Sequence, residues 1–137
     1  MNRTTQARVA IVDDDEPVRD ALSMMLRAAG YAVDAYASAE AFLAKKPPAP
    51  PACVVLDVRM PGMTGLELQE RLADRGFDLP IVFLTGHGDV PMAVRAMKRG
   101  AFDFLEKPVD DARLLAIVKG AVEFSATPKP IALPTGP

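Results

Sequence analysis

Three short runs in which every residue is apolar most strongly constrain the fold of this chain. They occupy residues 9–12, 53–56 and 81–84 and are rich in Val and Ile. A strand with one face in water alternates apolar and polar residues, whereas a wholly apolar run is typical of a strand buried on both faces, as in a parallel sheet. Residues 32–36 and 102–105 are weaker strand candidates, so the sequence predicts as many as five strands.

Helical patterns fill the segments between these runs. Residues 18–29 carry apolar side chains at steps of three and four, which form one stripe of a helix, and Gly30 follows as a C-terminal stop. Residues 114–122 repeat the stripe near the end of the chain. Strands that alternate with helices predict a doubly wound α/β domain, with a five-stranded parallel sheet and five helices.

Two helix starts can be placed from capping residues. Thr64 and Glu67 have the spacing of a capping box. Asp89 is expected to cap a helix that runs through Arg99, since Pro91 is tolerated in a first helical turn.

Length and proline distribution favour one domain with a tail. A chain of 137 residues is long enough to bury an independent core. Of its 13 prolines, four lie within residues 47–51 and four within the last ten residues. We therefore expect one domain over residues 1–124, followed by a Pro-rich tail or linker over residues 125–137.

Charge and composition argue against several classes of protein. The formal net charge is −2, so we expect no direct binding of nucleic acid. The longest apolar runs have five residues, far below the ~20 that a membrane-spanning helix needs, and the N-terminus does not read as a secretory signal. Cys53 is the single cysteine, which excludes a disulfide framework, and we expect a cytoplasmic protein.

Polar side chains follow the expected strands at their carboxyl ends, where open α/β sheets bind ligands. Asp13 and Asp14 follow the first strand, Asp57 the third, Thr85 the fourth and Lys107 the fifth. Each alone would be a turn former or a helix cap, but together they gather carboxylates, a hydroxyl and an ammonium. A divalent cation relieves the repulsion between the carboxylates, and oxygen ligands suit Mg²⁺. This set is equipped for phosphoryl transfer, with one carboxylate as nucleophile.

Five motifs, taken in order, resemble the receiver domains of response regulators in two-component signalling. They are residues 11–15, 56–61, 64–65, 85–89 and 104–108. The resemblance extends from residue 9 to about residue 124, and residues 85–96 look like the FixJ-type branch. It implies a flavodoxin-like fold of the CheY-like receiver kind and a signalling domain that is not an enzyme in the ordinary sense.

The resemblance also implies an acceptor and a metal site. Asp57 would accept a phosphoryl group from a sensor histidine kinase. Asp14 would ligate Mg²⁺ directly together with Asp57, Asp13 would support the ion through water, and the backbone carbonyl of Arg59 would complete the protein ligands.

Further residues are implied to carry the response. Lys107 would pair with phosphoryl oxygens, and its bond to Pro108 is usually cis in such domains. Thr85 would move to donate a hydrogen bond, and the rotamer of Phe104 would report phosphorylation. The surface of the fourth helix, fifth strand and fifth helix would change, and we expect a phosphorylation-dependent homodimer through the fourth helix and fifth strand.

Three alternatives remain open at this point. The chain could be the receiver half of a longer FixJ-type transcription regulator, since such relatives continue into a DNA-binding domain. A small aspartate phosphatase of the haloacid dehalogenase type would use Asp13 as nucleophile and Asp15 as its partner, but Glu16 stands where that family has Thr or Val. A pseudo-receiver that only binds a partner is disfavoured, because every acceptor-site residue is present.

Overall fold

The structure, a computed structural model, describes residues 6–45, 50–86 and 88–126. Strands and helices alternate along it, and their bounds are β1 (Arg8–Val12), α1 (Glu16–Ala28), β2 (Ala32–Tyr36), α2 (Ala39–Ala44), β3 (Cys53–Asp57), α3 (Gly65–Asp74), β4 (Ile81–Thr85), α4 (Val90–Lys98), β5 (Asp103–Glu106) and α5 (Asp111–Ala126).

The strands form one parallel sheet in the order β2-β1-β3-β4-β5. Every residue of β3 and β4 is buried, as expected for central strands covered on both faces. The three apolar runs are the cores of β1, β3 and β4, which confirms that prediction. The weaker candidates are also strands, β2 with the expected bounds and β5 one residue later than expected.

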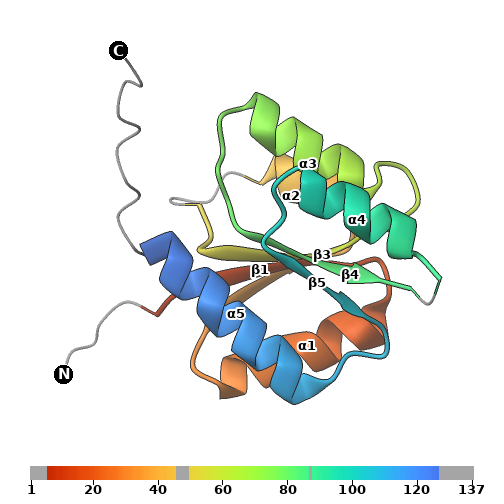
Figure 1. Cartoon of the computed structure of the whole chain (residues 1–137). Helices are drawn as coiled ribbons and strands as arrows, with labels where there is room; N and C mark the ends of the chain where they lie inside the picture. The colour runs from red at the N-terminus through yellow and green to blue at the C-terminus, as the bar shows by residue number, and fades with distance from the viewer. Residues whose placement is uncertain (1–5, 46–49, 87, 127–137) are drawn as a thin grey trace, which may run out of the picture.

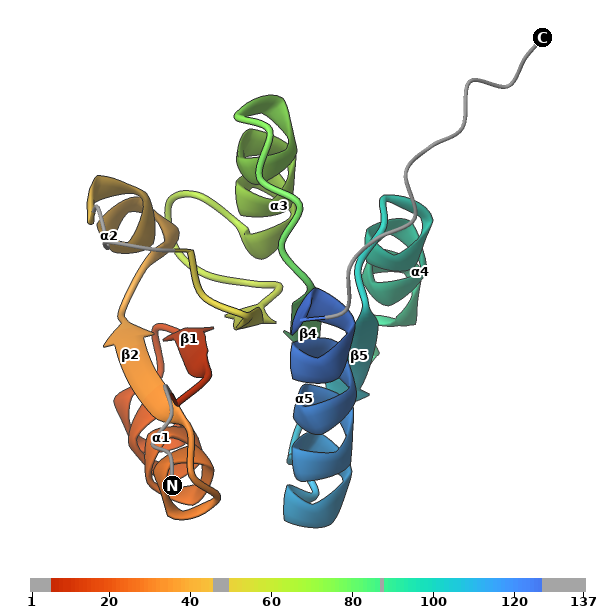
Figure 2. The ribbon, with the colours of Figure 1, turned by 90° about the vertical axis from the view of Figure 1, so that its left-hand side faces the viewer.

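Two hydrophobic clusters cover the two faces of the sheet, because alternate strand residues point to opposite sides. Val54 and Leu56 of β3 join the cluster that includes Leu68 of α3, whereas Cys53 and Val55 join the cluster that includes Leu22 of α1 and Leu114 of α5. Figure 1 and Figure 2 show the result, with α2, α3 and α4 on one side of the sheet and α1 and α5 on the other. The predicted doubly wound α/β fold is confirmed.

The ends of the chain can be compared with the expected domain bounds. Helix α5 continues through Ala126, and the rest of the expected tail, residues 127–137, lies outside the described residues. Among the described residues, no helix combines the length and the apolar character needed to cross a membrane.

Candidate functional site

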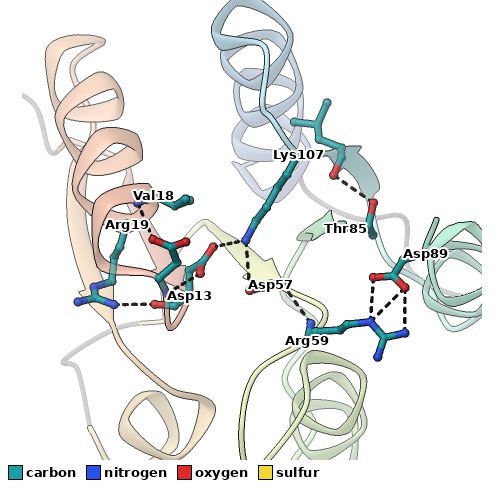
Figure 3. A network of polar contacts seen from close by, with 10 residues as sticks. Asp13, Val18, Arg19, Asp57, Arg59, Thr85, Asp89 and Lys107 are labelled. Atoms are coloured by element: carbon teal, nitrogen blue, oxygen red, sulfur yellow. Dashed lines mark hydrogen bonds and ion pairs between the residues drawn. The ribbon is translucent and has the colours of Figure 1, made fainter. Parts of the chain in front are cut away.

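The carboxyl ends of β1, β3, β4 and β5 lie side by side, and this arrangement assembles the site. Val12 pairs with Leu56, Asp57 pairs with Leu84, and Thr85 pairs with Glu106. The residues that directly follow β1 and β5, Asp13 and Lys107, therefore meet Asp57 and Thr85 at one edge of the sheet. Figure 3 shows the side chains of Asp13 and Lys107 converging on Asp57, while the hydroxyl of Thr85 is turned toward the backbone carbonyl of Leu105.

Three carboxylates form the acidic part of the site. Asp13, Asp14 and Asp57 each offer an oxygen, and these atoms lie within 4.8 Å of one another. Asp13 is fully buried and Asp57 is 6% exposed, whereas Asp14 is exposed. The strand geometry thus places two charges inside the protein and leaves the third open to solvent.

Lys107 is the cation of the site. Its ammonium nitrogen lies 3.1 Å from Oδ2 of Asp13 and 3.3 Å from Oδ2 of Asp57. Partial burial lowers the pKa of Lys107, but the close contact with Asp13 and the charges of Asp57 and Asp13 outweigh it and raise the pKa above its ordinary value. Lys107 is therefore charged at neutral pH and is shared between two carboxylates.

Asp57 is held in an environment that opposes its charge. Burial, followed by the charge of Asp13, raises its pKa to about 6, although Lys107 and a hydrogen bond from the backbone N–H of Arg59 act in the opposite direction. That N–H donates to Oδ1 of Asp57 over 3.1 Å. The surroundings stabilise the charged form of Asp57 poorly, so an additional cation would stabilise that form strongly.

The donor set fits a hard divalent cation. Oδ1 of Asp13 accepts a 2.9 Å hydrogen bond from the backbone N–H of Asp15. Oδ2 has the ion-pair contact with Lys107 but no hydrogen bond of good geometry among the described residues. Three carboxylates face one ammonium, so negative charge is in excess. Oxygen ligands with spare acceptor capacity and uncompensated charge are those that Mg²⁺ takes.

Thr85 and Asp13 lie on opposite sides of Asp57 (Figure 3). The side chain of Thr85 is buried, and its hydroxyl donates a long hydrogen bond of 3.4 Å to the backbone carbonyl of Leu105. A bond of that length holds the hydroxyl weakly. Phe104, one residue before Leu105, is half-buried and packs against the cluster beneath α3 and α4.

The side chain of Arg59 is the main feature of the site that sequence reasoning missed. Its guanidinium makes three contacts of 2.9–3.0 Å with both carboxylate oxygens of Asp89. These hydrogen bonds hold the pKa of Asp89 below its ordinary value. The predicted capping of α4 by Asp89 was wrong: Asp89 occupies the N-cap position but makes no side-chain cap bond, because Arg59 takes its carboxylate.

The packing role of Gly65, which belongs to the motif at residues 64–65, is a second feature that the sequence did not reveal. Gly65 is the first residue of α3, and a Cβ atom there would overlap the backbone carbonyl oxygen of Asp57 and lie 3.0 Å from Cα of Val58. Its N–H donates a 2.9 Å hydrogen bond to the carbonyl of Val58. Glycine therefore lets α3 pack directly against the backbone that carries Asp57.

Other predictions at this edge agree with the structure. The Lys107–Pro108 peptide bond is cis. Thr64 and Glu67 form the predicted capping box at the start of α3.

Comparison with known proteins finds one family across most of the chain. The family model described as the response regulator receiver domain matches residues 9–119. The chain is 50% identical over 118 residues to the transcriptional regulatory protein FixJ of Azorhizobium caulinodans, which covers 86% of this chain and 56% of that protein. The chain spans a little over half the length of the curated FixJ relatives it matches.

Solved structures give the same similarity. The chain matches full-length FixJ from B. japonicum with a TM-score of 0.83 and 46% identity, over 90% of this chain and 61% of that one. It matches the structure titled FixJ-N with a TM-score of 0.81 and 46% identity, over 95% of this chain and 100% of that one.

Proposed function

The chain belongs to the response regulator receiver family of two-component signalling, in its FixJ-type branch, and from that premise we propose that Asp57 accepts a phosphoryl group from a sensor histidine kinase in a Mg²⁺-dependent reaction. One observation carries the proposal. Asp57 is a buried carboxylate within 4.8 Å of two others, and its Oδ2 contacts the ammonium of Lys107.

The proposed step is a phosphoryl transfer between two side chains. A carboxylate oxygen of Asp57 attacks the phosphorus of the kinase's phosphohistidine, so that an O–P bond forms and the P–N bond breaks. The imidazole keeps the electron pair of the broken bond and takes up a proton from solvent. A bound cation favours the ionised form of Asp57, whose pKa is raised to about 6 in the metal-free site, and the ionised form is the nucleophile.

The metal would be held by the acidic cluster. We propose that Asp14 and Asp57 ligate Mg²⁺ directly with the backbone carbonyl of Arg59, and that Asp13 supports the ion through water. The ion would neutralise charge on the phosphoryl oxygens. Asp13 also anchors the other cation of the site, since its Oδ2 holds the ammonium of Lys107 at 3.1 Å.

Lys107 and Thr85 supply the remaining charge and hydrogen bonding. The ammonium of Lys107 is already directed at Asp57, so it can pair with a phosphoryl oxygen without leaving the site. The weak bond of Thr85 to Leu105 leaves its hydroxyl available as a donor. Movement of Thr85 toward Asp57 would change the space next to Phe104, which we propose as the readout residue.

The surface that changes is proposed to lie on α4, β5 and α5. Val90, Val94 and Met97 follow one another along α4 at steps of four and three, and they are 53%, 45% and 38% exposed. An exposed apolar stripe on a helix is typical of an interaction surface. We propose that phosphorylation promotes a symmetric homodimer there.

Labelling of the acceptor tests this function directly. The protein is incubated with radiolabelled acetyl phosphate and Mg²⁺, and acid-labile label on the protein is counted. We expect label on the wild type and on Asp74→Asn, an exposed carboxylate at the end of α3, and none on Asp57→Asn, because an amide is a poor nucleophile. Undiminished Mg²⁺-dependent labelling of Asp57→Asn would refute the proposal, and loss of label only in Asp13→Asn would favour the phosphatase alternative.

A role in transcription is a second candidate for the whole protein. The relatives named as transcriptional regulatory proteins are longer than this chain, which matches 56–58% of their length. The candidate is that this domain is the receiver half of such a regulator, with the output domain beyond α5. The mass of the native protein on an immunoblot separates the two possibilities. Two further points remain predictions from the family and the sequence. The domain signals and has no substrate of its own, and the protein is cytoplasmic.

A further inference from the structure

The first turns of four helices share one hydrogen-bonding pattern. In each, the third backbone N–H donates to the side chain of the N-cap residue, and the fourth backbone N–H donates to the backbone carbonyl of that same residue. The cap pairs are Asp15 with Val18, Ser38 with Ala41, Thr64 with Glu67 and Asp110 with Arg113. The carbonyls of the same four residues accept from Arg19, Phe42, Leu68 and Leu114. Side-chain capping is thus the rule for the helices described.

Helix α4 departs from this pattern. Both its third and its fourth amides, Met92 and Ala93, donate to the backbone carbonyl of Asp89, each over 3.1 Å. The backbone of Asp89 has ψ 27°, whereas the N-caps Ser38 and Thr64 have ψ 161° and 166°. Pro91 has no N–H, so Met92 offers the amide that a cap on α4 would take.

The carboxylate that could cap α4 is engaged elsewhere. Arg59 binds both oxygens of Asp89 in a fork (Figure 3). The side chain of Asp89 is 12% exposed, although that of Arg59 is 67% exposed. The backbone N–H of the same Arg59 donates to Oδ1 of Asp57. Asp89 is therefore bound to a residue of the acceptor site through its carboxylate, and it is also the N-cap residue of α4, whose start has no side-chain cap.

The opposite end of α4 is fixed to α3. The side-chain amide of Gln69 donates a 3.1 Å hydrogen bond to the carbonyl of Ala96, and Arg99 forms a 2.6 Å ion pair with Glu70. The Gln69 contact is buried. At the first turn of α4, by contrast, the N–H of Met92 can change its acceptor from the backbone carbonyl of Asp89 to the carboxylate of Asp89.

We propose that the carboxylate of Asp89 exchanges between two partners: it holds Arg59 while Asp57 is unmodified, and it caps the amide of Met92 once a phosphoryl group on Asp57 draws Arg59 away. The exchange rests on the proposed function for its trigger. Phosphorylation changes the charge of Asp57 from about −1 to about −2, and an Arg guanidinium binds phosphoryl oxygens in the same bidentate way as it binds a carboxylate. The backbone N–H of Arg59 already donates to Asp57, so a phosphoryl group on Asp57 would lie close to Arg59.

The exchange would link the site to the surface on α4. Capping requires the backbone of Asp89 to rotate toward the extended conformation of the other caps, which moves the first turn that carries Val90. Val90 and Val94 begin the exposed apolar stripe of α4. The equilibrium between the two arrangements of Arg59 shifts only by the difference in free energy with which each arrangement binds the phosphoryl group.

The exchange can be tested first without phosphorylation. In Arg59→Ala the carboxylate of Asp89 loses the guanidinium and keeps only the backbone hydrogen bond with Gly86. We therefore expect a scalar coupling across a hydrogen bond between the Met92 amide nitrogen and Cγ of Asp89. Hydrogen exchange of the Met92 amide should slow about fivefold, the effect of a typical N-cap. Arg99→Ala, which breaks the ion pair at the other end of α4, should leave both readouts at the wild-type value, and Arg59→Ala/Asp89→Ala should abolish the coupling. An Arg59→Ala protein without the coupling overturns the exchange.

The second arm uses beryllofluoride with Mg²⁺ as the phosphoryl stand-in. Its binding is followed by a ¹⁹F resonance that must be absent in Asp57→Asn. We expect the wild type to show the same Met92 coupling as Arg59→Ala once beryllofluoride is bound. Bound beryllofluoride with an unchanged Met92 amide overturns the proposed trigger while the acceptor function stands. Absence of the ¹⁹F resonance overturns the acceptor function and the trigger together, and the Arg59→Ala result then decides the exchange itself.

Discussion

The ammonium nitrogen of Lys107 lies 3.3 Å from Oδ2 of Asp57, and this is the longer of the two contacts that Lys107 makes in the acidic cluster. The shorter contact, 3.1 Å, goes to Asp13. Because one cation serves two buried carboxylates, Asp57 is left with a charge that its surroundings do not fully compensate. Burial and the charge of Asp13 raise the pKa of Asp57 to about 6, and the shared ammonium offsets only part of that rise.

That pKa predicts how stability depends on pH in the absence of metal. A folded-state pKa above the unfolded value of 3.8 means that the folded protein binds the proton more tightly. The charge on Asp57 therefore opposes folding fully above about pH 6, and the penalty disappears as the pH falls through about 4. We expect the wild type, relative to Asp57→Asn, to gain about 2 kcal/mol in free energy of unfolding between pH 7.5 and pH 4.5.

Urea denaturation of both proteins in EDTA measures this difference. The comparison with Asp57→Asn cancels the carboxyl groups that titrate in the opposite direction, such as Asp89, whose pKa is lowered by Arg59. Parallel stability curves for the two proteins across this pH range would contradict the assignment of a destabilising charge to Asp57.

Removal of carboxylates tests the metal site. We expect Asp13→Ala to weaken Mg²⁺ binding about tenfold and Asp14→Ala to weaken it further, because direct ligation contributes more than support through water. Asp74→Ala, which removes an exposed carboxylate at the end of α3, is the matched control and should bind Mg²⁺ as the wild type does. The chain has no Trp, so calorimetric titration is the suitable measurement. Equal Mg²⁺ affinity in Asp14→Ala and the wild type would exclude Asp14 as a ligand.

Much of this site follows from sequence because the fold itself places it. Wholly apolar runs identify the central strands, and parallel strands bring their carboxyl ends to one edge. Asp13, Asp57 and Thr85 follow or end one of the central strands, and Lys107 follows the edge strand β5, so their placement at one edge needs only the topology. The capping box at Thr64 is likewise local, since its partners are three residues apart.

The features that the sequence did not predict depend on contacts between distant segments. Capping preference is a local rule, and it failed at Asp89 because the competing Arg59 lies 30 residues earlier in the chain. The requirement for glycine at position 65 arises from the backbone carbonyl of Asp57, which only packing of α3 against β3 brings near. Strand order predicts which residues meet, but it does not predict which of two available partners a side chain takes.

Gly65 provides a test of that packing. We expect Gly65→Ala to lower the free energy of unfolding by about 2–4 kcal/mol and to reduce labelling of Asp57, because the added Cβ must displace the backbone that carries the acceptor. Gly120→Ala is the control, since a Cβ there would lie 3.6 Å from the ring of Phe102 in ordinary contact. In the interior of α5 that substitution should raise stability by about 0.5–1 kcal/mol. Thermal or urea unfolding separates the two, and equal stability of both variants would refute the close approach of α3.

Thr85 is the residue that should separate phosphorylation from its consequence. Its hydroxyl makes one long hydrogen bond, to Leu105, so Thr85→Ala should lose no more than about 1 kcal/mol of stability and should still accept label at Asp57. It lacks the hydroxyl that would be drawn toward the phosphoryl group, and we therefore expect it to dimerise poorly when phosphorylated. Thr85→Ser keeps a hydroxyl and should restore dimerisation. Sedimentation velocity at matched levels of phosphorylation is the measurement. A wild type that stays monomeric when phosphorylated rules out the dimer, and equal dimerisation of the wild type and Thr85→Ala shows that Thr85 does not couple the acceptor site to α4.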